Sequence, residues 1–167
     1  MRALAGVGET LPDVELPATT GAPVNLHRLP GDTVIFCYPW TGRPGLPNPP
    51  DWDNIPGAHG STPQAQAYAA LHVDIVKSGV KVFGLSLQST DYQREFAKRF
   101  ALPFALLSDA GEQFSKSLEL PVFETGGTTY LSRLTIFASH GVIRHLRYPV
   151  TDPAGDAAAM LAWLESR

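Results

Sequence analysis

Ser61 is the leading candidate for a reactive side chain, because it is the first residue of a helix-patterned stretch that ends near Ser78. Pro63 is favourable just inside a helix start, where its missing N–H would have had no partner. Ser61 or Thr62 is expected to be the N-cap, whose side-chain oxygen accepts a hydrogen bond from the first turn. A thiolate would be strongly favoured at this end, because free amides and the helix dipole stabilise negative charge. The residue present is a serine, whose hydroxyl ionises far less readily than a thiol.

Other kinds of chemistry have weaker support. A serine hydrolase would need a base beside Ser61, but His59 is only two residues away and no G-x-S-x-G elbow is present. None of the five histidines has the spacing from a carboxylate or thiolate that a metal site requires. They are His27, His59, His72, His140 and His145. No phosphate-binding or dinucleotide-binding glycine pattern occurs either. Cys37 lies in an apolar run and is interpreted as an inert buried thiol.

The segment before Ser61 predicts a strand followed by a long loop. Residues 34–38 (VIFCY) form an apolar run without alternation, which is typical of a strand buried on both faces of a sheet. Pro39 stops this strand. Residues 40–60 contain five prolines and four glycines, and a loop of this length is either functional or a proline-stiffened surface insertion. Trp52 and Ile55 are expected to attach it to the body of the protein.

The remaining chain predicts an α/β protein with one mixed sheet and helices on both of its faces. Residues 12–16 and 24–26 are expected to form an edge hairpin, and residues 80–87 a second buried strand parallel to the first. A helix through Phe100, an extended segment over 102–107 and a short helix over 109–120 follow. Residues 129–138 are expected to be one strand that contains Arg133, paired antiparallel with residues 142–148. Asp152 and Pro153 begin the last helix.

Composition limits the class of protein. The chain has 167 residues, which favours a single domain over 1–167, and its 44% apolar and 17% charged residues are typical of a globular fold. A net charge of −3 without a basic stripe argues against a nucleic-acid partner. The first residues lack an apolar leader segment and no stretch has transmembrane length, which predicts a cytoplasmic protein with no membrane partner. One cysteine excludes an internal disulfide.

Several motifs in this order resemble those of the peroxiredoxins, and among them the bacterioferritin comigratory protein or Q type. They are LPD at 11–13, VNL at 24–26, FCYP at 36–39, GAHGSTPQ at 57–64, LLSD at 106–109, RLTIF at 133–137 and HGVI at 140–143. The resemblance covers nearly the whole chain. It implies a thioredoxin-like fold with an N-terminal β-hairpin extension and a proline-rich active-site loop over 40–60.

The resemblance also implies a function and a set of site residues. Peroxiredoxins are antioxidant enzymes in which a peroxidatic cysteine attacks the O–O bond of hydrogen peroxide or an organic hydroperoxide and becomes a sulfenic acid. Ser61 stands at the position of that cysteine, and Arg133 at that of the arginine that orients the peroxide. Pro39, Gly60 and Thr62 correspond to substrate-binding positions. No cofactor is implied.

The chain departs from the family pattern at three positions. Ser61 replaces the nucleophile, so this chain is expected to be inactive as a peroxidase. Gln66 stands where many members carry a resolving cysteine, which implies recycling by an external thiol such as thioredoxin or glutathione. Ala58 replaces the family threonine, for which Thr41 is the substitute candidate. The chain is expected to be a monomer or a weak homodimer.

Two origins of Ser61 are open. It is either an engineered exchange of cysteine for serine or the natural residue of a family member that lost peroxide reduction. The otherwise intact GSTPQ motif at 60–64 and Arg133 favour the engineered origin. The alternative function is a non-catalytic peroxiredoxin-fold domain that uses the preserved pocket for binding or regulation.

Overall fold

The structure is a computed structural model that describes residues 6–167. Residues 1–5 lie outside the described residues. The parts of two predictions that fall on them are the start of the expected domain over 1–167 and the first residues of the chain, which were expected to lack a leader segment. The strands are β1 (Glu15–Ala18), β2 (Gly21–Asn25), β3 (Asp32–Cys37), β4 (Val80–Ser86), β5 (Leu106–Ser108), β6 (Val122–Thr125), β7 (Thr128–Leu131), β8 (Leu134–Ser139) and β9 (Val142–Arg147). The helices are the 3-10 turn η1 (Trp52–Asn54), α1 (Ser61–Ala70), α2 (His72–Lys77), α3 (Thr90–Arg99), α4 (Gln113–Leu118) and α5 (Pro153–Ser166).

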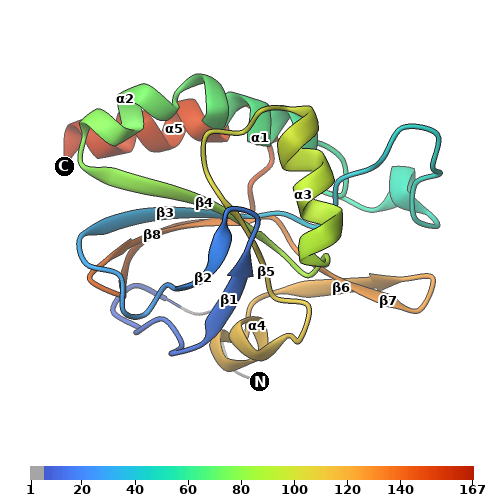
Figure 1. Cartoon of the computed structure of the whole chain (residues 1–167), viewed down its shortest axis with the longest axis horizontal. Coiled ribbons are helices and arrows are strands. Elements are labelled where there is room, and N and C mark those ends of the chain that lie inside the picture. The colour runs from blue at the N-terminus through green and yellow to red at the C-terminus, as the bar shows by residue number, and fades with distance from the viewer. Residues whose placement is uncertain (1–5) are drawn as a thin grey trace.

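A seven-stranded mixed sheet in the order β2-β1-β5-β4-β3-β8-β9 forms the centre of the molecule (Figure 1). β3 is parallel to β4 and antiparallel to β8. Side chains of α1, α2, α3 and α5 share one hydrophobic core, and those of α4 and the N-terminal hairpin share the other. Val34 and Phe36 enter the first core while Ile35 and Cys37 enter the second, which explains why the run at 34–38 lacks alternation. The predicted α/β fold with helices on both faces is therefore confirmed.

Several local predictions are confirmed with small shifts in their bounds. β1 and β2 form the expected antiparallel hairpin, and β2 is an edge strand. β2 begins at Gly21, three residues before the expected strand over 24–26. The stretch from 61 to 78 is two helices, with Leu71 between them. Ser89 caps α3 by accepting from the Tyr92 amide, and Asp152 caps α5 by accepting from the Gly155 amide.

The prediction of a single strand over 129–138 is wrong. That stretch divides into β7 and β8, and Arg133 lies in the break between them rather than inside a strand. β7 pairs with β6 in a separate two-stranded sheet that was not expected. The Ser132 amide donates to the Pro121 carbonyl at 2.9 Å, which closes the base of this second hairpin as the chain passes to the main sheet.

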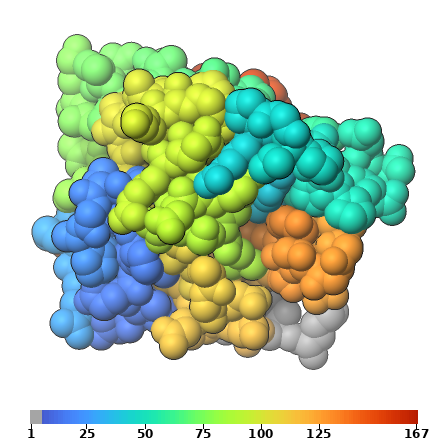
Figure 2. All heavy atoms as spheres, turned by 45° about the vertical axis from the view of Figure 1, so that its right-hand side comes forward, coloured from blue at the N-terminus to red at the C-terminus, as the bar shows by residue number. Residues whose placement is uncertain are grey.

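Residues 40–60 form the expected loop, with η1 as their only regular element. Trp52 is buried, and its ring lies 5.5 Å from Trp40, 5.7 Å from Phe123 and 5.1 Å from Tyr130. Figure 2 shows the loop, in cyan and teal, lying against the orange β6–β7 hairpin and beside α3. Trp52 is thus confirmed as an anchor, whereas Ile55 is only half-buried. None of the helices in residues 6–167 is long and apolar enough to cross a membrane.

Candidate active site

Ser61 is the first residue of α1, and the prediction that Ser61 or Thr62 caps this helix is wrong. The N-cap is Gly60, whose φ of +113° is a backbone conformation that glycine adopts without a side-chain clash. The Gly60 carbonyl accepts the first helical hydrogen bond from the Gln64 amide at 3.0 Å. The Ser61 side chain is therefore not used as a cap. Its Oγ is buried and has no hydrogen-bond partner among residues 6–167, and the residue is 4% exposed.

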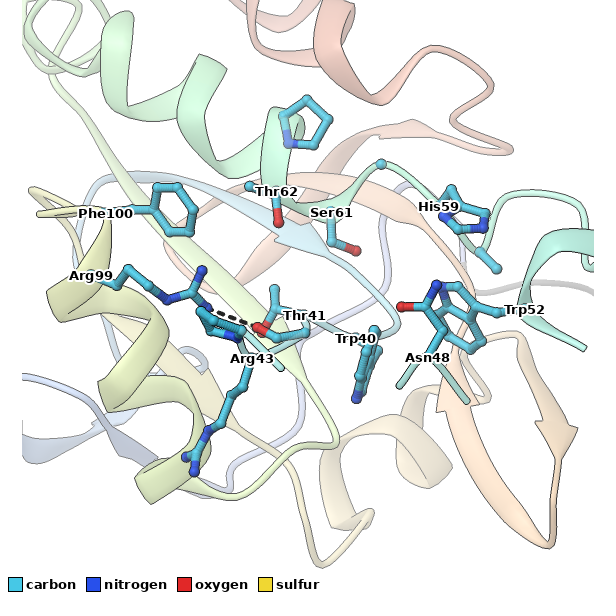
Figure 3. A pocket seen from close by; sticks show the side chains of 15 residues that line it. Trp40, Thr41, Arg43, Asn48, Trp52, His59, Ser61, Thr62, Arg99 and Phe100 are labelled. Carbon is cyan, nitrogen blue, oxygen red and sulfur yellow. Dashed lines mark hydrogen bonds between the residues drawn. The ribbon is translucent and has the colours of Figure 1, made fainter. Parts of the chain in front are cut away.

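Ser61 faces a cavity of about 410 Å³ that lies between α1, α3 and the 40–60 loop (Figure 3). Thr41, Gly60 and Thr62 also line this cavity, so four of the predicted site residues meet there. Pro39 does not belong to this group. It lines a neighbouring cavity of about 210 Å³ beside Tyr92 and Tyr130.

The Thr41 hydroxyl is held by a neighbouring glutamine. Thr41 Oγ1 and its backbone amide both lie 3.2 Å from Gln88 Oε1, and Gln88 Nε2 donates to the Thr41 carbonyl at 3.1 Å. Because the Thr41 hydroxyl donates its hydrogen bond to Gln88 Oε1, Thr41 Oγ1 offers the cavity an acceptor rather than a donor. Thr41 as a replacement for the family threonine remains a prediction.

Arg133 lies behind the loop that leads into α1 and does not line the cavity. Leu134 is paired with Cys37, so Arg133 falls just past the end of β3, where the chain enters the 40–60 loop. Its Nη2 donates to three successive carbonyls at 3.1 to 3.2 Å: Gly57, Ala58 and His59. Arg133 therefore fixes the backbone immediately before Ser61.

The charge of Arg133 is not balanced by a directly paired carboxylate among the described residues. The guanidinium is 4% exposed, its Nη1 donates to Gln64 Oε1 at 2.7 Å, and its Nε has no partner. Burial lowers the pKa of Arg133 to about 10, so the group remains cationic at neutral pH. The region beside Ser61 thus combines a buried cation with a helix N-terminus, and both favour an anion.

A buried hydrogen-bond network behind Arg133 was missed by the sequence analysis. Asp156 of α5 is fully buried, and its Oδ2 accepts from Gln64 Nε2 at 3.2 Å, from the Tyr68 hydroxyl at 2.7 Å and from the Thr135 hydroxyl at 2.6 Å. Its Oδ1 accepts from Arg147 Nε at 2.8 Å. The available signal was an aspartate four residues before Met160, a spacing that places both residues on the same face of α5.

Neither of two other candidate groups is paired with Ser61. His59 Nε2 lies 2.6 Å from Asp53 Oδ1, and no hydrogen bond joins His59 to Ser61, so the geometry gives no support to a serine hydrolase. Cys37 is fully buried in the core, and burial raises the pKa of its thiol, in agreement with an inert role. Within residues 6–167, no group of three or more His, Cys, Asp or Glu side chains is placed to hold a metal ion.

The Gly60→Ala change should destabilise the fold by at least about 2 kcal/mol. A Cβ at this position would lie 2.7 Å from Pro153 Cγ, and the φ of +113° disfavours any side chain. The free energy of unfolding in urea measures the effect. Gly111→Ala is the control, because a Cβ there meets nothing within 4 Å. Equal stabilities of the two variants would contradict the role given to Gly60.

The mixed sheet, its helices and its N-terminal hairpin define a thioredoxin-like α/β domain. A sequence model of the Redoxin family matches residues 6–161, and the chain therefore belongs to the redoxin family.

The similar relatives are peroxiredoxins of the Q or BCP type. Chloroplastic peroxiredoxin Q of Sedum lineare is 32% identical over 115 residues, which are 68% of this chain and 54% of that protein. Peroxiredoxin bcp1 of Schizosaccharomyces pombe is 28% identical over 114 residues, which are 67% and 51% of the two chains. This chain thus spans about half the length of the curated relatives it matches.

Solved structures show the same fold. Peroxiredoxin Q of Xanthomonas campestris has a TM-score of 0.76 at 24% identity, covering 96% of this chain and 98% of that one. BcpB of Mycobacterium tuberculosis has a TM-score of 0.78 at 22% identity, covering 98% of both chains. These similarities establish the arrangement of the elements.

Proposed function

We propose that this chain is a peroxiredoxin-type thiol peroxidase domain in which Ser61 occupies the position of the peroxidatic cysteine. As it stands, the chain does not reduce peroxides. The observation that carries this proposal is the buried and unpartnered Ser61 Oγ, which sits at the first residue of α1 and faces a cavity. The names of the curated relatives, peroxiredoxin Q and bcp1, support the same function.

The electrostatics around position 61 are suited to a thiolate rather than to a hydroxyl. The α1 amides and the Arg133 guanidinium both favour negative charge, and Arg133 is buried with Nε unpartnered. A thiolate at this position would place an anion beside this cation. A serine hydroxyl stays protonated at neutral pH, so it adds no negative charge and provides no nucleophile.

In the cysteine form, the reaction would run by attack of the thiolate sulfur on the distal peroxide oxygen. The S–O bond forms as the O–O bond breaks, and the leaving oxygen takes a proton to give water or an alcohol. The resulting sulfenic acid needs an external thiol to reduce it, because position 66 is glutamine and Cys37 is fully buried. Thioredoxin or glutathione as reductant, a monomeric or weakly dimeric state and a cytoplasmic location remain predictions.

The test is to measure peroxide consumption by the Ser61→Cys protein in a stopped-flow assay with a thiol donor. The thiol variant should turn over hydrogen peroxide and cumene hydroperoxide, whereas the Ser61 protein and Ser61→Ala should not. Ser61→Ala is the matched control, because it preserves the burial of the site without a nucleophile. A folded Ser61→Cys protein without turnover would refute the proposal.

A second candidate is a non-catalytic binding or regulatory domain. The cavity persists although Ser61 and Ala58, which both line it, lack the groups that peroxide reduction requires. A serine codon at position 61 in the encoding gene, together with measurable binding of an organic anion by calorimetry, would favour this function. A flat titration would count against it.

A further inference from the structure

The arginine that faces the cavity is Arg99 rather than Arg133. Arg99 is the last residue of α3, and Figure 3 shows its guanidinium directed into the cavity, on the side opposite Trp52. Nε donates to Glu95 Oε1 at 2.8 Å, and Nη2 donates to the Gly42 carbonyl at 2.8 Å and to Glu95 Oε2 at 3.3 Å. Nη1 makes no hydrogen bond within the described residues. One donor of this cation is thus free to bind a ligand.

The charge on this side of the cavity is positive. Arg99 and Arg43 share a single carboxylate, Glu95, at 2.8 Å and 3.8 Å. The hydrogen bond from Arg99 lowers the pKa of Glu95, so the carboxylate is ionised at neutral pH and offsets only one of the two cations. None of the described residues that line the cavity is acidic. Arg43 also lines the cavity, but its guanidinium stacks on Tyr92 at 4.1 Å, whereas that of Arg99 is directed into the cavity (Figure 3).

The rest of the cavity wall is suited to an organic molecule. Trp40, Trp52 and Phe100 provide aromatic surface, and Ser61 and Thr62 place hydroxyls on the side of the α1 N-terminus. The Ser61 Oγ is an unpartnered polar atom of a residue that is only 4% exposed. Apolar walls with a few convergent polar groups are typical of small-molecule sites.

We propose that this cavity binds organic carboxylates, with the carboxylate on Arg99 Nη1 and the apolar body against the aromatic side chains of Trp40 and Phe100. In the peroxidase form, and resting there on the proposed function, the preferred substrates are hydroperoxides that carry a carboxylate. Their peroxide group lies at position 61 while Arg99 holds the negative charge at the other side. Hydrogen peroxide makes no use of this second contact.

The binding test uses the Ser61 protein and two ligands that differ in charge: 4-isopropylbenzoate and the neutral 4-isopropylbenzamide. Calorimetry should show that the carboxylate binds about tenfold more tightly or better, the factor that one charge-assisted hydrogen bond provides. Arg99→Gln should remove this preference, and Glu95→Gln should increase the affinity for the carboxylate. Arg94→Gln is the matched control, since Arg94 lies on the same helix, pairs with Asp91 and does not line the cavity.

Equal affinities for the two ligands, or a carboxylate preference that survives Arg99→Gln, would overturn the proposal. Because this titration involves no turnover, its result is independent of whether Ser61→Cys restores a peroxidase. A second arm then compares cumene hydroperoxide with its 4-carboxy derivative in the Ser61→Cys protein. The ratio of the two second-order rate constants should favour the carboxylate, and Arg99→Gln should bring the ratio back toward one. A ratio of one before that substitution would refute the substrate assignment.

Discussion

Replacing Arg133 with methionine in the Ser61→Cys protein should slow peroxide consumption by about a hundredfold to a thousandfold, because the loss of a buried positive charge behind position 61 removes electrostatic stabilisation of the negative charge that develops there. The guanidinium is a buried cation beside position 61, and methionine fills a similar volume without charge. The change should also raise the pKa of the new thiol, because the nearby positive charge that stabilises the thiolate is lost. Rates are measured at a pH above the thiol pKa, so that the two effects are separated.

Arg133→Lys serves as the control for this prediction. Lysine keeps the charge but cannot bond the carbonyls of residues 57–59 and Gln64 together as the guanidinium does. Its thiol pKa should stay low while its rate falls by an intermediate amount. If Arg133→Met retained both the rate and the low thiol pKa, Arg133 would only support the backbone of the loop.

The second large effect is expected at Asp156, where replacement by alanine should cost about 3–5 kcal/mol of stability, the range for breaking a buried charged pair. The substitution leaves four donors without their acceptor: the Gln64 amide, the Tyr68 and Thr135 hydroxyls and the Arg147 guanidinium. Burial, and then the charge of Asp156, raises the pKa of Tyr68 well above its usual range. The Tyr68 hydroxyl therefore stays protonated and donates its hydrogen bond to Asp156 throughout the ordinary pH range.

The midpoint of urea unfolding measures this loss, and Asp152→Ala on the same helix is the matched control. Asp152 caps α5 through the Gly155 amide, so its loss should cost only about 1 kcal/mol. Asp156→Ala should also release Gln64 and thereby weaken the support of Arg133. Similar costs for the two aspartates would show that the buried network contributes little beyond an ordinary cap.

The fold was predictable where the signal is local. The unbroken apolar run of β3 reports burial on both faces, because its side chains alternate between two cores. Ser89 and Asp152 cap the helices that follow them, since a cap bonds an amide only three residues away. Contacts of this kind involve residues within one helical turn of each other, so the local sequence is enough to predict them.

The errors fall where distant segments meet. Gly60 rather than Ser61 caps α1, and Pro153, far along the chain, contacts Gly60 closely. The break at Ser132 and Arg133 allows β7 to pair with β6 while β8 pairs with β3, and no local pattern reports two competing partners. Asp156 and Arg99 were likewise absent from the predicted site, because Asp156 bonds Gln64, 92 positions away, and Arg99 bonds Gly42, 57 positions away.

The sequence by itself determined the order of the elements, the helix that begins at Ser61 and the serine in place of a thiol, because these follow from residue type and short-range spacing. Only the tertiary structure decided that the Ser61 hydroxyl is left without a partner, that Arg133 holds the loop from behind and that Arg99 faces the cavity. The physical reason is that a side chain's free donors and its charge balance depend on every segment packed around it. Those segments are brought together only when the chain folds.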